Sequence, residues 1–242
     1  MVIATATTAT DPLQLGLSRE RVSEDVLAFD RPERTRFLDA AREHSPSYFP
    51  IFFAMSRTGL RPSEARALQW GNYDPGRQVL MIRRTFGLRD IQGTPKTRQS
   101  RRDVDVSPQL ADLLKRQRKA QAEAKLAGRL AELPEFIFIE PAGGPLDRRT
   151  FERAFPRILV KADLGPQYSP KSLRHTYASL MISEGANLLY VARQLGHASV
   201  AITEKHYTRW IPQAVPAVPQ LDDAAEAKSG SKTAGVGSSV AV

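Results

Sequence analysis

The sequence has 242 residues, a formal net charge of +9 and no cysteine. This length accommodates one large domain or two small ones, and a hydrophobic fraction of 41% suffices for a real core. The missing cysteines exclude a disulfide scaffold, a thiol nucleophile and a zinc ribbon. The positive charge favours a polyanionic partner, because Lys and Arg that bind phosphate release condensed counterions. Nucleic acid, an anionic membrane and a ribosomal surface remain open.

Residues 1 to about 30 are predicted to form a leader or linker that is first rich in Ala and Thr and then polar. The stretch lacks a basic start followed by an apolar segment, so no signal peptide is expected. No run of the chain approaches the roughly 20 apolar residues that a membrane span needs. We therefore expect a cytoplasmic protein without a membrane partner.

Helical periodicity begins at Asp30. A second helix is predicted over 50–57, and Gly59 suits the left-handed position just past its end. The segment Arg61-Pro62-Ser63-Glu64 predicts another helix start. Pro is favoured at the first helical position, and a Glu three residues after a cap can accept a hydrogen bond from the amide of that cap.

The middle of the chain predicts a small sheet. Strands are expected over 79–85 and 104–106, separated by the basic stretch 89–102, with a further short candidate over 136–139. The remaining helices are predicted over 108–126, 148–162, 170–183 and 188–195, with Gly185 and Gly196 ending the last two. Pro, Ala, Gly and Ser dominate residues 212–242, which are predicted to be mostly disordered. The expected fold is a mainly helical α+β domain with a small antiparallel sheet over about 31–211.

The sequence offers no pattern for a metal or a nucleotide. Asp and Glu form no cluster suited to Mg²⁺, the four histidines form no zinc pattern, and a GxxxxGK[ST] loop is missing. We expect no metal and no cofactor. A protein of this kind that acts on phosphate esters must stabilise negative charge with side-chain cations.

Arg61 and Lys96 are the first two candidate site residues, one at a predicted helix start and the other in a predicted hairpin. Arg61 at a helix start would meet a phosphate together with free amides and the positive end of the helix dipole, and Glu64 is well placed to orient it. The alternative is a surface Arg before an ordinary helix. Lys96 lies between two predicted strands, where it can reach a DNA groove, protonate a leaving oxygen or simply solvate a turn. The nearby Arg98, Arg101 and Arg102 are expected to contact backbone phosphate or water.

The last candidates lie in the C-terminal helices. Lys171 and Arg174 are three residues apart, hence on one face of an opening helical turn, where a salt-bridging surface is the alternative. Gly196 should turn the chain so that His197 projects from a corner, and Tyr207 follows ten residues later. A capping or packing His and a core Tyr are the alternatives.

Taken together, the segments TGLRPSE, a hairpin Lys, LRHTYAS, QLGHASV and a following Tyr resemble, in order and spacing, the signature of the tyrosine recombinases (phage integrases). The resemblance covers about 31–211 and implies the catalytic-domain architecture of that family. It implies that Tyr207 attacks a scissile phosphate to give a 3′-phosphotyrosyl link, while Arg61 and Arg174 clamp the non-bridging oxygens. Lys96 would protonate the leaving 5′-oxygen, and His197 would hydrogen-bond the phosphate.

The resemblance implies a site-specific recombinase of double-stranded DNA, self-associated as a tetramer on DNA, with accessory DNA-bending proteins as candidate partners. Two features depart from the family pattern. Lys171 occupies a position that is usually His, and unlike His it cannot readily accept a proton near pH 7. Only about 30 residues precede the match, where full members carry a DNA-clamping domain, so residues 1–30 are a candidate remnant of that domain. The alternatives are a truncated or decayed integrase that only binds DNA, and a topoisomerase-like nicking and resealing enzyme.

Overall fold

The first helix begins after Asp30 and the second ends at Gly59, as the sequence predicts. The computed structural model describes residues 27–87, 92–94 and 100–212. α1 (Arg31–His44) starts in a capping box: the Asp30 carboxylate accepts from the Glu33 amide at 2.7 Å, and the Glu33 carboxylate accepts from the Asp30 amide at 2.9 Å. α2 (Phe49–Thr58) ends at Gly59, whose φ of 64° is the left-handed conformation expected there.

Two small antiparallel sheets follow. The first has the order β1 (Tyr73–Asp74), β2 (Val79–Ile82), β5 (Arg102–Asp105), and the second pairs β3 (Thr85–Phe86) with β4 (Gln92–Gly93). The expected strand over 79–85 is thus divided into β2 and β3. The expected strand over 136–139 is wrong, because Phe136 and Ile139 each form one isolated bridge, to Gln69 and to Pro145, and no ladder continues between them.

The C-terminal half is helical. The later helices are α4 (Pro108–Leu126), α5 (Arg148–Lys161), α6 (Pro170–Ser183), α7 (Leu188–Leu195) and α8 (Val200–Tyr207), and single 3₁₀ turns cover Trp70–Asn72 and Thr208–Trp210. The predicted bounds of α4, α6 and α7 are confirmed, and Gly185 (φ 81°) and Gly196 (φ 69°) follow α6 and α7 in the left-handed conformation. α8 was not predicted, because it is short and buries only Thr203 and Tyr207.

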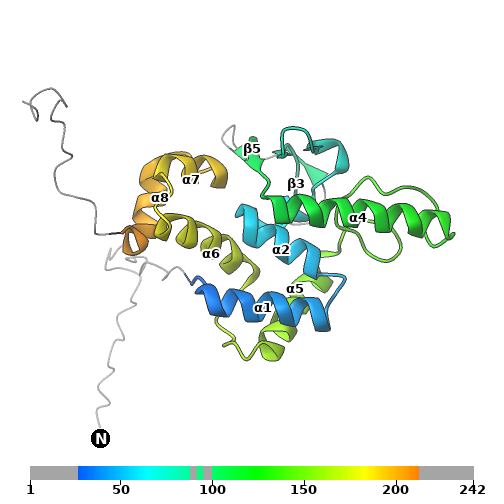
Figure 1. Ribbon diagram of the computed structural model, residues 1–242, viewed down its shortest axis with the longest axis horizontal. Helices are drawn as coiled ribbons and strands as arrows, with labels where there is room; N and C mark the ends of the chain where they lie inside the picture. The colour runs from blue at the N-terminus through cyan, green and yellow to red at the C-terminus, as the bar shows by residue number, and fades with distance from the viewer. Residues whose placement is uncertain (1–26, 88–91, 95–99, 213–242) are drawn as a thin grey trace, which may run out of the picture. The chain divides into compact units, whose positions relative to one another are not determined.

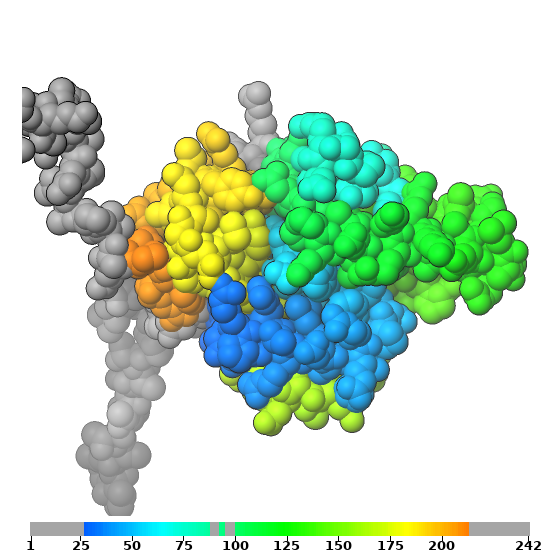
Figure 2. Space-filling view, in the orientation of Figure 1, coloured from blue at the N-terminus to red at the C-terminus, as the bar shows by residue number. Residues whose placement is uncertain are grey.

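The helices enclose two clusters of buried side chains. In the larger one, α1, α2, α4, α5 and the three-stranded sheet surround an aromatic centre of Phe29, Phe37, Phe52, Phe151 and Phe155. In the smaller one, α6, α7 and α8 bury Tyr177, Ala178, Ile182, Val191, Leu195 and Tyr207. Figure 1 shows α1 beside α5, and α6 between α2 and the α7–α8 pair. Segment 170–211 packs against the rest of the domain, through α6 on α2 and α7 on β5 (Figure 2).

Gly59 joins the two clusters through a close approach. A Cβ on this residue would lie 2.5 Å from the Tyr177 ring and 2.7 Å from the Leu195 side chain, so a larger residue would push α2 away from α6 and α7. The chain leaves this contact at Arg61 and enters α3 (Pro62–Arg66). The position of Arg61 relative to α6 and α7 is therefore fixed by packing as well as by its own hydrogen bonds.

None of the helices in the described ranges is long and apolar enough to cross a membrane. The predicted leader and tail fall almost entirely outside these ranges, as do Lys96 and Arg98.

Candidate active site

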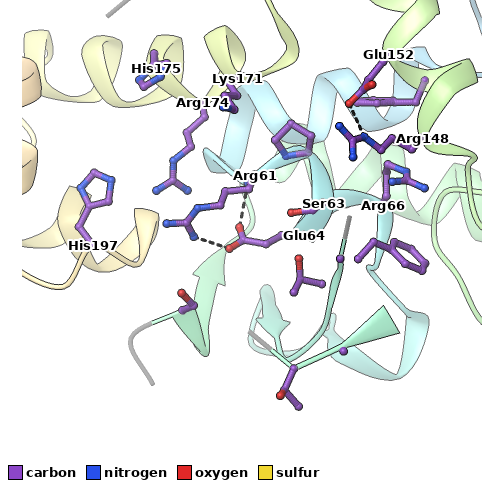
Figure 3. Close-up of a pocket in the computed structure, with 18 residues that line it drawn as sticks. Arg61, Ser63, Glu64, Arg66, Arg148, Glu152, Lys171, Arg174, His175 and His197 are labelled. Atoms are coloured by element: carbon purple, nitrogen blue, oxygen red, sulfur yellow. Dashed lines mark hydrogen bonds and ion pairs between the residues drawn. The ribbon is translucent and has the colours of Figure 1, made fainter. Parts of the chain in front are cut away.

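Four of the candidate site residues line one pocket of about 780 Å³. Arg61 comes from the start of α3, Lys171 and Arg174 from the first turns of α6, and His197 from the turn between α7 and α8. Figure 3 shows Arg61, Arg174 and His197 pointing toward one another, with Lys171 on the same side of α6. The structure thus brings together side chains that are up to 136 positions apart, from Arg61 to His197, and all of them can donate hydrogen bonds to a phosphate.

Arg61 is oriented by Glu64, as the sequence predicts. One Glu64 oxygen accepts from the Arg61 amide at 3.0 Å, and the other accepts from the Arg61 Nη1 at 2.7 Å. The side chain of Arg61 remains 40% exposed, whereas that of Glu64 is buried. The guanidinium is therefore held from one side and open to a ligand from the other.

Arg174 is a buried cation held by the ends of two helices. Its Nη1 donates to the Gly59 carbonyl at 2.9 Å, and its Nη2 donates to the Leu195 carbonyl at 2.8 Å. These carbonyls belong to the C-terminal ends of α2 and α7, which carry the negative end of the helix dipole. Burial, and next the charge of Arg61, lower the pKa of Arg174 to about 9, so the guanidinium stays charged at pH 7.

Arg102 corrects a prediction. It was expected to contact phosphate or water, but it is buried and binds the protein with each of its nitrogens: Nη1 and Nη2 donate to the two Glu64 oxygens at 3.1 and 3.0 Å, and Nε donates to the Gln194 carbonyl at 2.5 Å. Arg102 lies two residues before buried Val104 in β5, and this alternation was the signal for an inward-facing side chain. Arg102 is thus a support for Glu64, and Arg101 is exposed.

Glu64 stands at the centre of three arginines. Burial alone would raise the pKa of Glu64, but Arg102, Arg61 and Arg174 outweigh burial and hold the pKa at about 2. The carboxylate therefore stays ionised over the whole physiological range, and it positions one guanidinium in the pocket while anchoring another behind it.

We expect the low pKa of Glu64 to make the fold acid-sensitive. A group whose pKa falls on folding stabilises the protein above its unfolded pKa of 4.5 and loses that contribution as the pH falls toward 2. Glu64→Gln should lower the free energy of unfolding at pH 7 by roughly 3 kcal/mol, because it leaves the buried Arg102 without a carboxylate. Between about pH 5 and 2 the free energy of unfolding of the variant should also fall less steeply than that of the unsubstituted protein. Urea unfolding across this range measures both effects.

Glu152→Gln is the matched control, because Glu152 forms a half-exposed ion pair with Arg148 at the same pocket. Exposed pairs of this kind contribute about 0–1 kcal/mol. A Glu64→Gln variant as stable as the Glu152→Gln variant would show that the Glu64 network does not hold the site together.

His197 is neutral and is held by a residue that the sequence did not point to. Its Nδ1 lies 2.8 Å from the Thr203 hydroxyl on α8. Burial, followed by the charges of Arg174 and Arg61, lowers the pKa of His197 to about 3. With Nδ1 occupied by Thr203, Nε2 is the nitrogen available to a bound phosphate.

Tyr207 lies beside the pocket rather than in it. The side chain is 1% exposed and packs among Tyr177, Leu195 and Trp210, and its hydroxyl is 2.8 Å from Nδ1 of His175. Burial raises the pKa of Tyr207 to about 12, although the charge of Arg174 works in the opposite direction. Tyr207 is therefore a core residue in this conformation, and His175 lines the pocket next to it.

Lys96 and Arg98 lie outside the described ranges, and the nearest described residues on either side, Thr94 and Ser100, line the pocket. Within those ranges no group of three or more His, Cys, Asp or Glu could hold a metal ion.

Relatives of known kind match most of the chain. The chain is 28% identical over 225 residues to a tyrosine recombinase XerC-like protein of Caldanaerobacter subterraneus subsp. tengcongensis, an alignment that covers 86% of the chain and 57% of the relative. The chain spans about half the length of the curated relatives that it matches.

Solved structures share the fold. The Tn1549 transposon integrase in complex with transposon right end DNA superimposes with a TM-score of 0.67 at 18% identity, over 78% of this chain and 63% of that one. The catalytic domain of bacteriophage HP1 integrase superimposes with a TM-score of 0.53 at 19% identity, over 78% of this chain and 90% of that one. The mainly helical fold with small antiparallel sheets is thus the tyrosine recombinase catalytic-domain fold. The sequence profile of the phage integrase family matches residues 29–213, and the chain therefore belongs to this family.

Proposed function

We propose that this chain is a site-specific DNA recombinase that breaks and rejoins double-stranded DNA through a covalent 3′-phosphotyrosyl link at Tyr207. The observation that carries the proposal is the pocket in which Arg61, Lys171, Arg174 and His197 converge. The Tyr207 hydroxyl is hydrogen-bonded to His175, which lines the same pocket. Several positive or neutral donors aimed at one point suit a phosphate whose negative charge grows as a fifth oxygen bonds to it.

Arg61, Arg174, Lys171 and His197 have roles that follow from their places in the pocket. Arg61 and Arg174 present guanidinium nitrogens to the non-bridging oxygens, for which a planar fork suits better than an ammonium. Lys171 supplies a further positive donor, and His197 donates through Nε2. Lys96 protonates the leaving 5′-oxygen, a role that rests on the family resemblance. The bond energy is retained in the phosphotyrosyl link, so the reaction needs no ATP.

The buried position of Tyr207 implies a conformational step before cleavage. Removing a side chain of this size from a buried cluster costs about 2 kcal/mol, which favours the buried conformation roughly thirtyfold in the absence of DNA. We propose that contacts with DNA offset this cost and draw Tyr207 toward the phosphate. Cleavage would then be confined to protein assembled on its DNA.

Strand exchange between two DNA sites determines how many copies of the chain must act together. Two duplex sites present four strands, and one tyrosine per strand requires four copies of the chain, which supports a tetramer on DNA. The structure of the Tn1549 transposon integrase with transposon right end DNA supports duplex DNA as the substrate. Accessory DNA-bending proteins and a cytoplasmic location complete the proposal.

A protein that only binds DNA is the second candidate, because a tyrosine that is 1% exposed cannot attack a phosphate without moving. The test is a pool of nicked suicide duplexes, randomised around the nick, incubated with the protein in EDTA and separated on a denaturing gel. Cleavage next to the nick releases a short strand and traps the adduct. The recombinase predicts a protein–DNA band that resists denaturation, whereas no band across the pool would leave DNA binding alone. Joined products from two sites would further separate a recombinase from a topoisomerase-like enzyme, which needs only one site.

A further inference from the structure

We propose that His175 is a catalytic residue that accepts the proton of the Tyr207 hydroxyl as Tyr207 attacks the phosphate, an inference that rests on the proposed function. The Tyr207 hydroxyl lies 2.8 Å from Nδ1 of His175. Among the described residues, Tyr207 has no other side-chain hydrogen bond, and the ring of His175 lines the phosphate pocket. His175 thus contacts both the nucleophile and the space where the phosphate must bind.

The direction of this hydrogen bond follows from the charges around His175. The groups that face it are Lys171 and Arg174 from α6, and His206 and Tyr207 from α8. Burial, and then Arg174, His206 and Lys171, lower the pKa of His175 to about 4, so the ring is neutral at pH 7. A phenol is a stronger acid than a neutral imidazole, so the hydroxyl donates and Nδ1 accepts.

The other candidate acceptors are occupied or charged. Lys171 stands where the family pattern usually has His, and an ammonium has no lone pair to accept a proton. His197 uses its Nδ1 for Thr203. Among the described residues, His175 is therefore the imidazole that hydrogen-bonds to the hydroxyl of the nucleophile.

Substrate binding should make His175 more basic. At rest the pKa of Tyr207, about 12, lies far above that of His175, about 4, and the proton stays on the phenol. A phosphate bound by Arg174 and Lys171 brings negative charge next to two of the cations that lower the pKa of His175, and this raises it. The base is thus activated by the substrate, which suppresses ionisation of Tyr207 in the absence of DNA.

In the cleavage step one P–O bond replaces another, and the proton of the Tyr207 hydroxyl moves to His175. The Tyr207 O–H bond breaks as the Nδ1–H bond of His175 forms, and the phenolic oxygen bonds to phosphorus. The bond from phosphorus to the 5′-oxygen breaks, and that oxygen takes a proton from Lys96. In the rejoining step the 5′-hydroxyl returns its proton to Lys96 as its oxygen bonds to phosphorus, the bond from phosphorus to Tyr207 breaks, and His175 returns its proton to the departing phenolic oxygen.

The first test measures single-turnover cleavage of a trapped suicide duplex from pH 6 to 9. His175→Asn keeps a hydrogen-bond acceptor near Nδ1 but cannot take up a proton, and it should slow cleavage roughly 10²-fold or more at pH 7. The cleavage rate of His175→Asn should rise tenfold per pH unit, because Tyr207 must then lose its proton to water before it attacks. His206→Asn is the control, because His206 flanks Tyr207 but forms no hydrogen bond with its hydroxyl, and it should stay within about threefold of the original protein.

A fluorinated tyrosine at position 207 separates proton transfer from packing. Fluorination lowers the phenol pKa, so it should restore His175→Asn at least tenfold and change the original protein much less. A merely structural His175 predicts no such selective rescue. Cleavage by His175→Asn as fast as that of His206→Asn would overturn the proposal, and faster cleavage would show that His175 only retains Tyr207 in its buried position.

A second test needs no DNA. ¹⁵N NMR of the imidazole should show Nδ1 of His175 unprotonated and Nε2 protonated at pH 7, and the opposite tautomer would overturn the acceptor role. If the unsubstituted protein forms no adduct at all, the proposed function fails. The tautomer still decides whether His175 accepts from Tyr207, so the two failures are distinguishable.

Discussion

Tyr207→Phe is expected to abolish covalent adduct formation with DNA while leaving DNA affinity nearly unchanged. The substitution removes the nucleophilic oxygen and no phosphate-neutralising charge, so the salt dependence of binding should be preserved. The phenyl ring still fills the cluster of Tyr177, Leu195 and Trp210. Losing the hydrogen bond to His175 should change the free energy of unfolding by only about 1 kcal/mol.

The measurement combines the suicide-duplex gel with a binding titration at two salt concentrations. Tyr190→Phe and Tyr177→Phe are the controls, because both tyrosines lie on the neighbouring helices α6 and α7, and both should still form the adduct. If the adduct persists in Tyr207→Phe and disappears in one of the controls, the nucleophile has been assigned to the wrong tyrosine.

Arg174→Lys should reduce the cleavage rate by about 10²–10³ although it keeps the positive charge. Arg174 spans two carbonyls, of Gly59 and Leu195, with two different nitrogens, and an ammonium cannot reproduce this geometry while also facing the pocket. The same substitution should lower the free energy of unfolding by roughly 2 kcal/mol, because hydrogen bonds of a charged donor to two helix ends are lost.

Arg61→Lys separates the two effects. Arg61 is 40% exposed, and among the described residues its guanidinium hydrogen-bonds only to Glu64, three positions away, so this variant should lose cleavage activity with little change in unfolding. The comparison uses single-turnover cleavage, DNA affinity and urea unfolding, with Arg36→Lys, at an exposed position of α1, as a reference. Arg174→Lys that cleaves as fast as Arg36→Lys would refute the clamping role of Arg174.

Local chemistry explains why much of the fold was predictable. Asp30 with Glu33, Arg61 with Glu64, and the glycines that follow α2 and α7 set helix ends through bonds within a few residues, and these ends agree with the structure. The same local signals place Arg61, Arg174 and His197 at helix termini. Their convergence in one pocket depends on packing between helices, and the sequence suggested it only through the family resemblance.

The unpredicted features depend on tertiary burial. The basic stretch near Arg102 resembles a DNA-contacting surface. Arg102, however, lies on the same buried face of β5 as Val104 and forms an ion pair with buried Glu64. Tyr207 was expected as a nucleophile, and its burial against α6 and α7 cannot be read from α8, which has little apolar periodicity. The role of Thr203 likewise requires His197 and α8 to be placed in space.

The most direct test of the account is to identify the residue that carries the DNA. The trapped adduct, formed in EDTA, is digested with a protease and a nuclease, and the modified peptide is sequenced by mass spectrometry. The account predicts a nucleotide 3′-phosphate on the oxygen of Tyr207 within the peptide from α8. A nucleotide on any other residue, or a 5′-phosphate link, would contradict it.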